Sequence, residues 1–80
     1  MKQRGNQYNA SDFLLQVGRI IKAEREKAGL TQEKLAEVNG VDYKYFQRIE
    51  YGEVNFTMKT LVKIANSLNL HPRNLLDIEK

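Results

Sequence analysis

The stretch QEKLAEVNGVDYKYFQRI, residues 32–49, decides the fold of this 80-residue chain. It predicts a short helix over residues 32–38, a turn at Asn39-Gly40, and a second helix over residues 43–51. Asparagine and glycine both tolerate the positive φ that such a turn requires. The apolar side chains that would hold two such helices at a steep angle are Leu35, Ala36, Val38, Val41, Phe46 and Ile49.

Polar residues mark where the two helices begin and end. Thr31 can cap the first helix and Asp42 the second, because their side-chain oxygens accept from free N–H groups of a first turn. Gly52 then suits the position that ends the second helix. The helix over residues 32–38 is too short to persist alone, so we expect it to depend on tertiary packing.

The segment before this stretch predicts one longer helix. Ser11 or Asp12 can cap it, and Gly29 suits its left-handed end. Its apolar residues recur at helical spacing and form one stripe: Phe13, Leu14, Val17, Ile20, Ile21 and Ala28.

The segment after it predicts two more helices. Thr57 caps a fourth helix, and Pro72 fits the first turn of a short fifth one. The fourth helix carries an apolar stripe of Leu61, Ile64, Ala65 and Leu68, with Met58 and Val62 at its edges. No segment alternates as a strand would. The fold class is therefore all-α, a compact five-helix bundle containing a helix-turn-helix.

Composition favours one soluble globular domain. Hydrophobic residues make up 41% of the chain and charged residues 29%. We assign residues 12–80 to the domain and residues 1–11, which are basic and lack periodicity, to a flexible segment. The absence of cysteine excludes disulfides and thiolate metal sites. No apolar run predicts a membrane span or signal peptide, so a cytoplasmic location is expected.

The solvent side of the second short helix carries the candidate binding residues. Tyr43 and Gln47 are four residues apart, as are Lys44 and Arg48. Lysine and arginine can donate to guanine O6 and N7 or to phosphate, glutamine can pair with adenine, and tyrosine can donate to phosphate. The net charge of +3 adds only weak support for a nucleic-acid partner.

Little in the sequence predicts catalysis. The single histidine, His71, has no second histidine, cysteine or acidic cluster nearby, so no metal site or catalytic triad can be assembled around it. We therefore expect no enzymatic activity, no cofactor and no small-molecule ligand.

Four motifs in order resemble one family. They are REKAGLTQEKLA (residues 25–36), NGVD (residues 39–42), RIEYG (residues 48–52) and TLVKIANSLNL (residues 60–70). Residues 17–76 resemble the Cro/phage-repressor-type, or XRE-like, helix-turn-helix domain with the lambda-repressor-like fold. The resemblance implies a second short helix that enters the DNA major groove.

The same resemblance implies roles for further residues. Gln32 would contact a phosphate and brace a base-reading side chain, while Asn55 and Lys59 would grip the sugar-phosphate backbone. Arg25 and Glu50 would form a structural salt bridge between the first helix and the reading helix. Tyr43, Lys44 and Arg48 would touch base edges, and Gln47 either base or backbone.

Several residues depart from the family pattern. Tyr43 and Tyr45 make the second short helix unusually aromatic. Glu24 occupies a place where relatives have an apolar residue, which implies a rotated helix or a basic partner for Glu24. Glu53 would repel phosphate.

The function expected from these features is a sequence-specific regulator of transcription that binds double-stranded DNA. We expect a homodimer on a palindromic operator, because pairing doubles the few contacts of so small a domain. The exposed parts of Leu70, Leu75, Leu76 and Ile78 could form the dimer surface or could cap the core. Two alternatives stay open: a protein-interaction module (an antitoxin or adaptor) that keeps the fold, and, with less support, an RNA-binding role.

Overall fold

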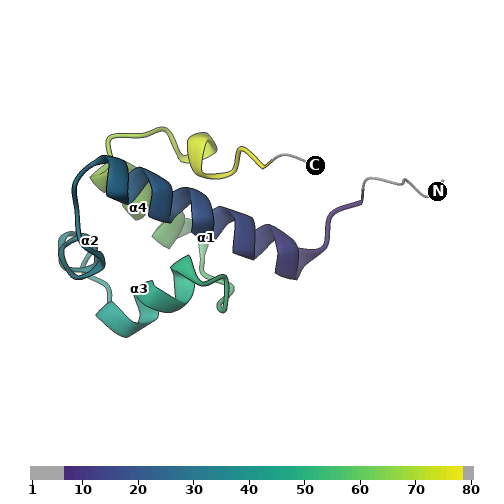
Figure 1. The fold of residues 1–80 in the computed structure, drawn as a ribbon, viewed down its shortest axis with the longest axis horizontal. Coiled ribbons are helices and arrows are strands. Elements are labelled where there is room, and N and C mark those ends of the chain that lie inside the picture. The colour runs from purple at the N-terminus through teal and green to yellow at the C-terminus, as the bar shows by residue number, and fades with distance from the viewer. Residues whose placement is uncertain (1–6, 79–80) are drawn as a thin grey trace.

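A computed structural model describes residues 7–78, which form four α-helices and one 3-10 helix (Figure 1). The elements in chain order are α1 (Ala10–Lys27), α2 (Gln32–Asn39), α3 (Tyr43–Glu50), α4 (Met58–Ser67) and η1 (Pro72–Leu75). No strand occurs within residues 7–78, so the predicted all-α class is confirmed. The expectation of a flexible segment over residues 1–11 falls largely outside this range, and residues 10 and 11 belong to α1.

The prediction of a fifth α-helix is wrong. Residues 72–75 form a single 3-10 turn, so the bundle has four α-helices rather than five. The N–H of Asn74 donates to the carbonyl of His71, and the N–H of Leu76 donates to that of Arg73. These bonds span three residues rather than four, which gives the tighter 3-10 winding and limits it to a short run.

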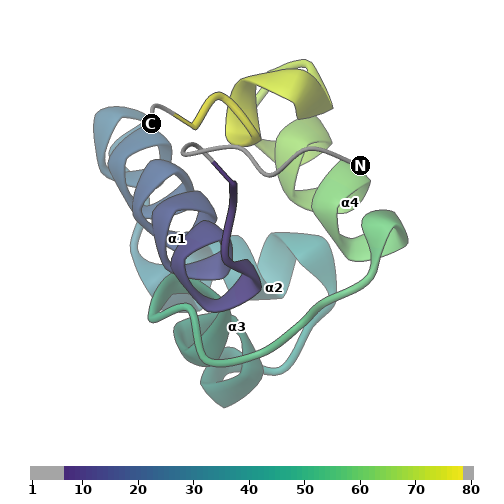
Figure 2. The same cartoon turned by 90° about the vertical axis from the view of Figure 1, so that its right-hand side faces the viewer.

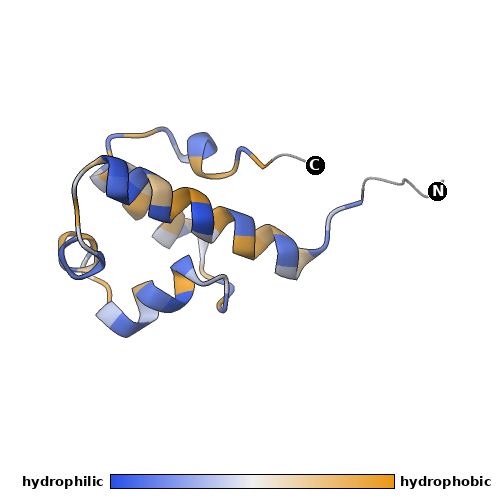
Figure 3. Ribbon diagram, in the orientation of Figure 1, coloured by the Kyte–Doolittle hydropathy of each residue, from blue (hydrophilic) through white to orange (hydrophobic). Residues whose placement is uncertain are grey.

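Helix α3 and the turn η1 lie on opposite sides of α1 (Figures 1 and 2). Helix α3 packs on α1 and α2, α4 packs on α2, and η1 packs on both α4 and α1. Helices α1 and α4 both carry orange, apolar bands (Figure 3), and the apolar residues that they bury are Val17 and Ile21 on α1 and Leu61, Ile64 and Ala65 on α4. The buried core consists of Val17, Ile21, Leu35, Ala36, Phe46, Ile49, Leu61, Ile64, Ala65 and Leu75.

Three of the predicted helix caps are confirmed. The side chains of Thr31, Asp42 and Thr57 accept hydrogen bonds from the N–H groups of residues 34, 45 and 60. The cap predicted for the first helix is wrong, since Asn9 caps α1 and accepts from the N–H groups of Ser11 and Asp12. Asparagine is as good a cap as serine or aspartate, so the helix begins two or three residues earlier than expected.

Two residues predicted to be apolar contacts lie outside the core. Val38 is 55% exposed, because Leu35, Ala36 and Asn39 take the inward side of α2. The buried Asn39 donates to the carbonyl of Leu35 and accepts from the Ser67 hydroxyl, which ties α2 to α4. Ala28 is exposed because it is already the C-cap of α1.

The C-terminal segment covers the core. Leu75 is fully buried, so it is not available for a dimer surface, whereas Leu76 beside it is 36% exposed. Leu70 and Ile78 are half-buried and pack against the core. The sequence left two roles open for this segment, a dimer surface or a cover over the core. The structure shows that Leu75 helps to cover the core.

Candidate nucleic-acid interface

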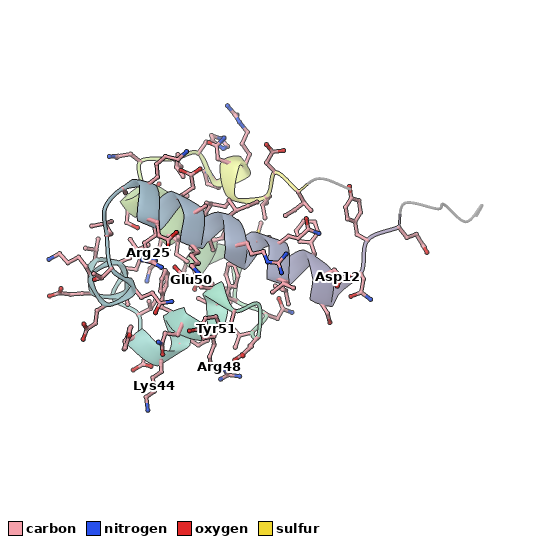
Figure 4. The ribbon with its side chains drawn as sticks, in the orientation of Figure 1. Asp12, Arg25, Lys44, Arg48, Glu50 and Tyr51 are labelled. Carbon is pink, nitrogen blue, oxygen red and sulfur yellow. The ribbon has the colours of Figure 1, made fainter. Side chains whose placement is uncertain are left out.

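Helix α3 presents two unlike faces. Phe46, Ile49 and Glu50 point into the protein and are at most 3% exposed. The side chains of Lys44 and Arg48 point away from the protein body (Figure 4). The sequence produces this division because residues 46, 49 and 50 recur on one side of a helix, while residues 44 and 48 recur on the other.

A buried salt bridge fixes the C-terminal end of α3 against α1 (Figure 4). The Nε of Arg25 donates to Oε2 of Glu50 at 2.7 Å, and its Nη2 donates to Oε1 at 3.2 Å. The third donor of Arg25, Nη1, binds the carbonyl of Leu30 at 2.7 Å. The hydrogen bond to Glu50 is the main reason why the pKa of Arg25 is raised, so this guanidinium stays charged.

Two glycines let the backbones of α1 and α3 approach each other. A Cβ on Gly18 would lie 2.5 Å from the carbonyl oxygen of Glu50, and one on Gly52 would lie 2.6 Å from the Cα of Leu15. Gly52 was predicted as a helix end, but the contact at Gly18 was not predicted. The sequence feature that could have predicted this contact is a glycine beside the apolar stripe in the middle of a helix, where glycine is otherwise unfavourable.

A chain of polar side chains runs outward from Glu50. The Nε2 of Gln32 donates to Oε1 of Glu50 at 2.8 Å. The Nε2 of Gln47 lies 3.3 Å from both Oε1 of Gln32 and the hydroxyl of Tyr43. Gln32 therefore points inward toward the salt bridge and α3, and Tyr43 ends this series of hydrogen bonds at the surface, where it is 40% exposed.

The remaining candidate residues border α3. Arg48 lies 3.7 Å from Glu53, and both side chains are more than half exposed, so this ion pair stays open to solvent. Asn55 is exposed in the loop between α3 and α4, and Lys59 is exposed in the first turn of α4. Glu24 has a basic partner at the surface, since it lies 3.5 Å from Lys27.

Elsewhere in residues 7–78, the candidate chemical groups do not form a comparable set. The His71 Nδ1 accepts from the N–H of Arg73 and caps η1. No group of three potential metal-ligating side chains occurs within residues 7–78. In the same range no helix is long and apolar enough to cross a membrane.

The arrangement of α2 and α3 matches a known family. A family model described as helix-turn-helix matches residues 21–75. The chain belongs to the helix-turn-helix family. The XRE-like resemblance drawn from the sequence is thereby confirmed, and with it the function of a DNA-binding transcriptional regulator.

Several relatives of this helix-turn-helix protein are known. The control protein C.SmaI of Serratia marcescens is 36% identical over 56 residues, which cover 70% of this chain and 67% of that protein. The crystal structure of the restriction-modification controller protein C.AhdI from Aeromonas hydrophila superposes with a TM-score of 0.76 at 34% identity, covering 78% of this chain and 94% of that one. The crystal structure of a transcriptional regulator of this family from Vibrio cholerae superposes with a TM-score of 0.78 at 30% identity. The match covers 84% of this chain and 38% of that one.

Proposed function

We propose that this regulator binds double-stranded DNA sequence-specifically, as a homodimer on a palindromic operator, with α3 in the major groove. The observation that carries the proposal is the asymmetry of α3. Its inner face is locked to α1, while its outer face presents Tyr43, Lys44, Gln47 and Arg48. A rigid helix with exposed donors on one face is the geometry that reads base edges.

The side chains of the outer face divide between bases and backbone. Lys44 and Arg48 are one turn apart and can donate to guanine O6 and N7. Asn55 and Lys59 lie just after α3, where they can bind phosphates and set the orientation of the domain on the duplex. The side chain of Gln32 is engaged within the protein, so we assign the phosphate contact there to the N–H groups at the start of α2.

The dimer surface that we propose is apolar. Met58, Val62 and Leu76 are 67%, 41% and 36% exposed, and Met58 and Leu76 line the same groove with Phe13, Leu14 and Phe56. One domain of this size reads few base pairs, so a second copy seated on this surface would double the contacts over two half-sites. We propose that the folded unit begins at Asn9, which caps α1, rather than at residue 12, and that its compartment is the cytoplasm.

An anisotropy titration with duplex DNA tests the proposal. We expect tight binding to one palindromic sequence and weaker binding to unrelated duplexes, with both affinities falling as salt rises because phosphate contacts release counterions. Absence of binding to any duplex at low salt would overturn the proposal and favour a protein-interaction role.

Sedimentation tests the dimer separately. The unmodified protein should sediment as a dimer, at least on operator DNA, and Val62→Lys should sediment as a monomer, because a lysine would be buried in the interface. The matched control is Val38→Lys, which alters another exposed valine that lies on α2, outside the proposed groove. A monomer on operator DNA, or an equal effect of both changes, would contradict the proposed surface.

A further inference from the structure

Residues 39 and 40 form the one asparagine-glycine pair in the sequence. In such a pair the backbone nitrogen of the glycine can attack Cγ of the asparagine, because a glycine has no Cβ to obstruct the approach. Chemistry of this kind makes asparagine a thermolabile residue in proteins. By its sequence, Asn39 is therefore the asparagine most open to this attack, and it lies at the turn between α2 and α3.

The reaction needs only water as a second reactant. The Gly40 nitrogen gives its proton to solvent and forms a bond to Cγ of Asn39, while Nδ2 of Asn39 takes up a proton and leaves as ammonia. The product is a cyclic imide. Water then adds to either imide carbonyl and opens the ring. One opening leaves aspartate, and the other leaves isoaspartate, in which the main chain runs through the side-chain carbon; no atom is oxidised or reduced.

The folded chain keeps the two reacting groups apart. Asn39 is the last residue of α2, and a helical side chain is directed back toward the start of its helix. Its Nδ2 donates to the carbonyl of Leu35 at 2.8 Å, in the direction opposite to Gly40. The N–H of Gly40 donates to the carbonyls of Ala36 and Glu37. The Asn39 amide therefore points away from the nitrogen that would attack it, and the proton of that nitrogen is engaged.

A contact with α4 holds this arrangement in place. Oδ1 of Asn39 accepts from the hydroxyl of Ser67 at 3.2 Å, a proton that Ser67 shares with the carbonyl of Ile64, and Asn39 is only 7% exposed. Helix α2 has 8 residues, so it depends on packing, and the ends of helices are among the first parts of a fold to open. The reaction therefore requires that the last turn of α2 first separate from α4.

We propose that Asn39-Gly40 is a deamidation site that the packing of α2 on α4 closes, and that its modification weakens this packing irreversibly. Aspartate at residue 39 has two acceptor oxygens and no donor, so a carboxylate oxygen would face the carbonyl of Leu35 in a buried place. Isoaspartate would lengthen the main chain between α2 and α3, whose relative position the turn sets. Either product therefore damages the helix-turn-helix in a way that refolding does not reverse.

Mass spectrometry of the full chain tests whether the fold closes the site. The protein is kept at mildly alkaline pH in buffer and in denaturing guanidinium chloride, and trypsin then releases the peptide of residues 35–44, in which Asn39 is the one asparagine. Asn39 should convert to aspartate and isoaspartate in the unfolded chain, and at least about tenfold more slowly in the folded chain, where α2 must first open.

Asn55 is the internal control. It is exposed in the folded chain but precedes Phe56, whose side chain obstructs the attack, so it should convert more slowly than Asn39 in guanidinium chloride. Equal rates for Asn39 in the folded and unfolded chains would overturn the proposal, because α2 would then not close the site. Conversion of Asn39 no faster than that of Asn55 in the unfolded chain would also overturn it.

A pair of variants on α4 tests the contact itself. Ser67→Ala removes the hydroxyl that Asn39 accepts from, so Asn39 in the folded variant should convert about 2- to 5-fold faster, in keeping with the net free energy of one shared hydrogen bond. The matched control is Thr60→Ala, which removes a hydroxyl that contacts Thr57 at the other end of α4 and should leave the rate unchanged. Equal rates in the two folded variants would contradict the proposed closure.

Asn39→Asp reproduces the aspartate product. It should raise the ratio of unfolded to folded chain about 5- to 150-fold in denaturant titrations, because a buried group loses its hydrogen bond to Leu35. The control is Asn66→Asp, an exposed position on α4, which should change this ratio little. Equal stability of the two variants would overturn the proposed damage. None of these measurements involves DNA, so their outcome is independent of the proposed function.

Discussion

The two faces of α3 differ in what holds their side chains. On the inner face, Phe46 and Ile49 are fully buried and Glu50 receives three hydrogen bonds from Arg25 and Gln32. On the outer face, Lys44 is exposed and Arg48 has only a solvent-open ion pair. The position of the helix therefore depends on residues on the side away from the proposed DNA contacts, so the residues proposed to read bases can vary without altering the fold.

The largest effect should follow from breaking the inner face at Glu50. Glu50→Ala leaves the charge of Arg25 buried without a countercharge, so the free energy of unfolding should fall by about 3–5 kcal/mol. Urea denaturation measures this loss. Glu53→Ala is the control, since that carboxylate is exposed and its removal should matter little. A loss below about 1 kcal/mol for Glu50→Ala would contradict this expectation, because a loss of that size is typical of a solvent-exposed ion pair.

The next effect concerns the close approach of α1 and α3. Gly18→Ala places a Cβ against the backbone carbonyl of Glu50, and such overpacking costs about 1–3 kcal/mol although alanine favours helices. Thermal unfolding measures the change. Lys22→Ala, an exposed position one turn further along α1, should shift stability by less than about 0.5 kcal/mol. Equal stability of the two variants would show that α3 moves freely against α1.

Changes on the outer face should leave stability nearly intact. Arg48→Ala or Lys44→Ala should alter the unfolding free energy by under about 0.5 kcal/mol but weaken binding to the operator by about 1–3 kcal/mol. Titrations against the operator and an unrelated duplex measure both effects. If one variant weakens both duplexes equally, that residue is a phosphate contact rather than a base contact.

The smallest effect should come from the rim of the outer face. Glu53→Gln removes a negative charge beside Arg48 and near the proposed phosphate contacts. We expect a modest rise in affinity for all duplexes, greatest at low salt because the pair is exposed to solvent. The free energy of unfolding of this variant should change by less than about 0.5 kcal/mol. Weaker binding of this variant would mean that Glu53 orients Arg48 for reading.

The local parts of the fold could be predicted because local chemistry determines them. Thr31, Asp42 and Thr57 cap their helices through bonds that reach only three residues ahead. Asn9 was missed because three neighbouring polar residues were equally good caps. The fifth helix was wrong because Leu75 is placed by its burial in the core, which a short apolar pattern cannot distinguish from a helix face.

The site could be predicted only in its residue types. The outer residues of α3 follow from helical spacing, and Arg25 was paired with Glu50 only through the family resemblance. The contact of Gly18 with the carbonyl of Glu50 and the bonds linking Gln32 to Glu50 and Gln47 join residues 15 to 32 positions apart. Contacts of this range depend on how the helices pack, which no local pattern contains.

The burial of Leu75 has a consequence for the order of events during synthesis. Four of the ten core residues, Leu61, Ile64, Ala65 and Leu75, follow the entire helix-turn-helix in the chain. Helices α1 to α3 therefore leave the ribosome with one side of their core uncovered, although domains generally begin to fold from the N-terminal end. The core that supports these helices is complete only when residue 75 has emerged, so the nascent chain should bind DNA only after that point.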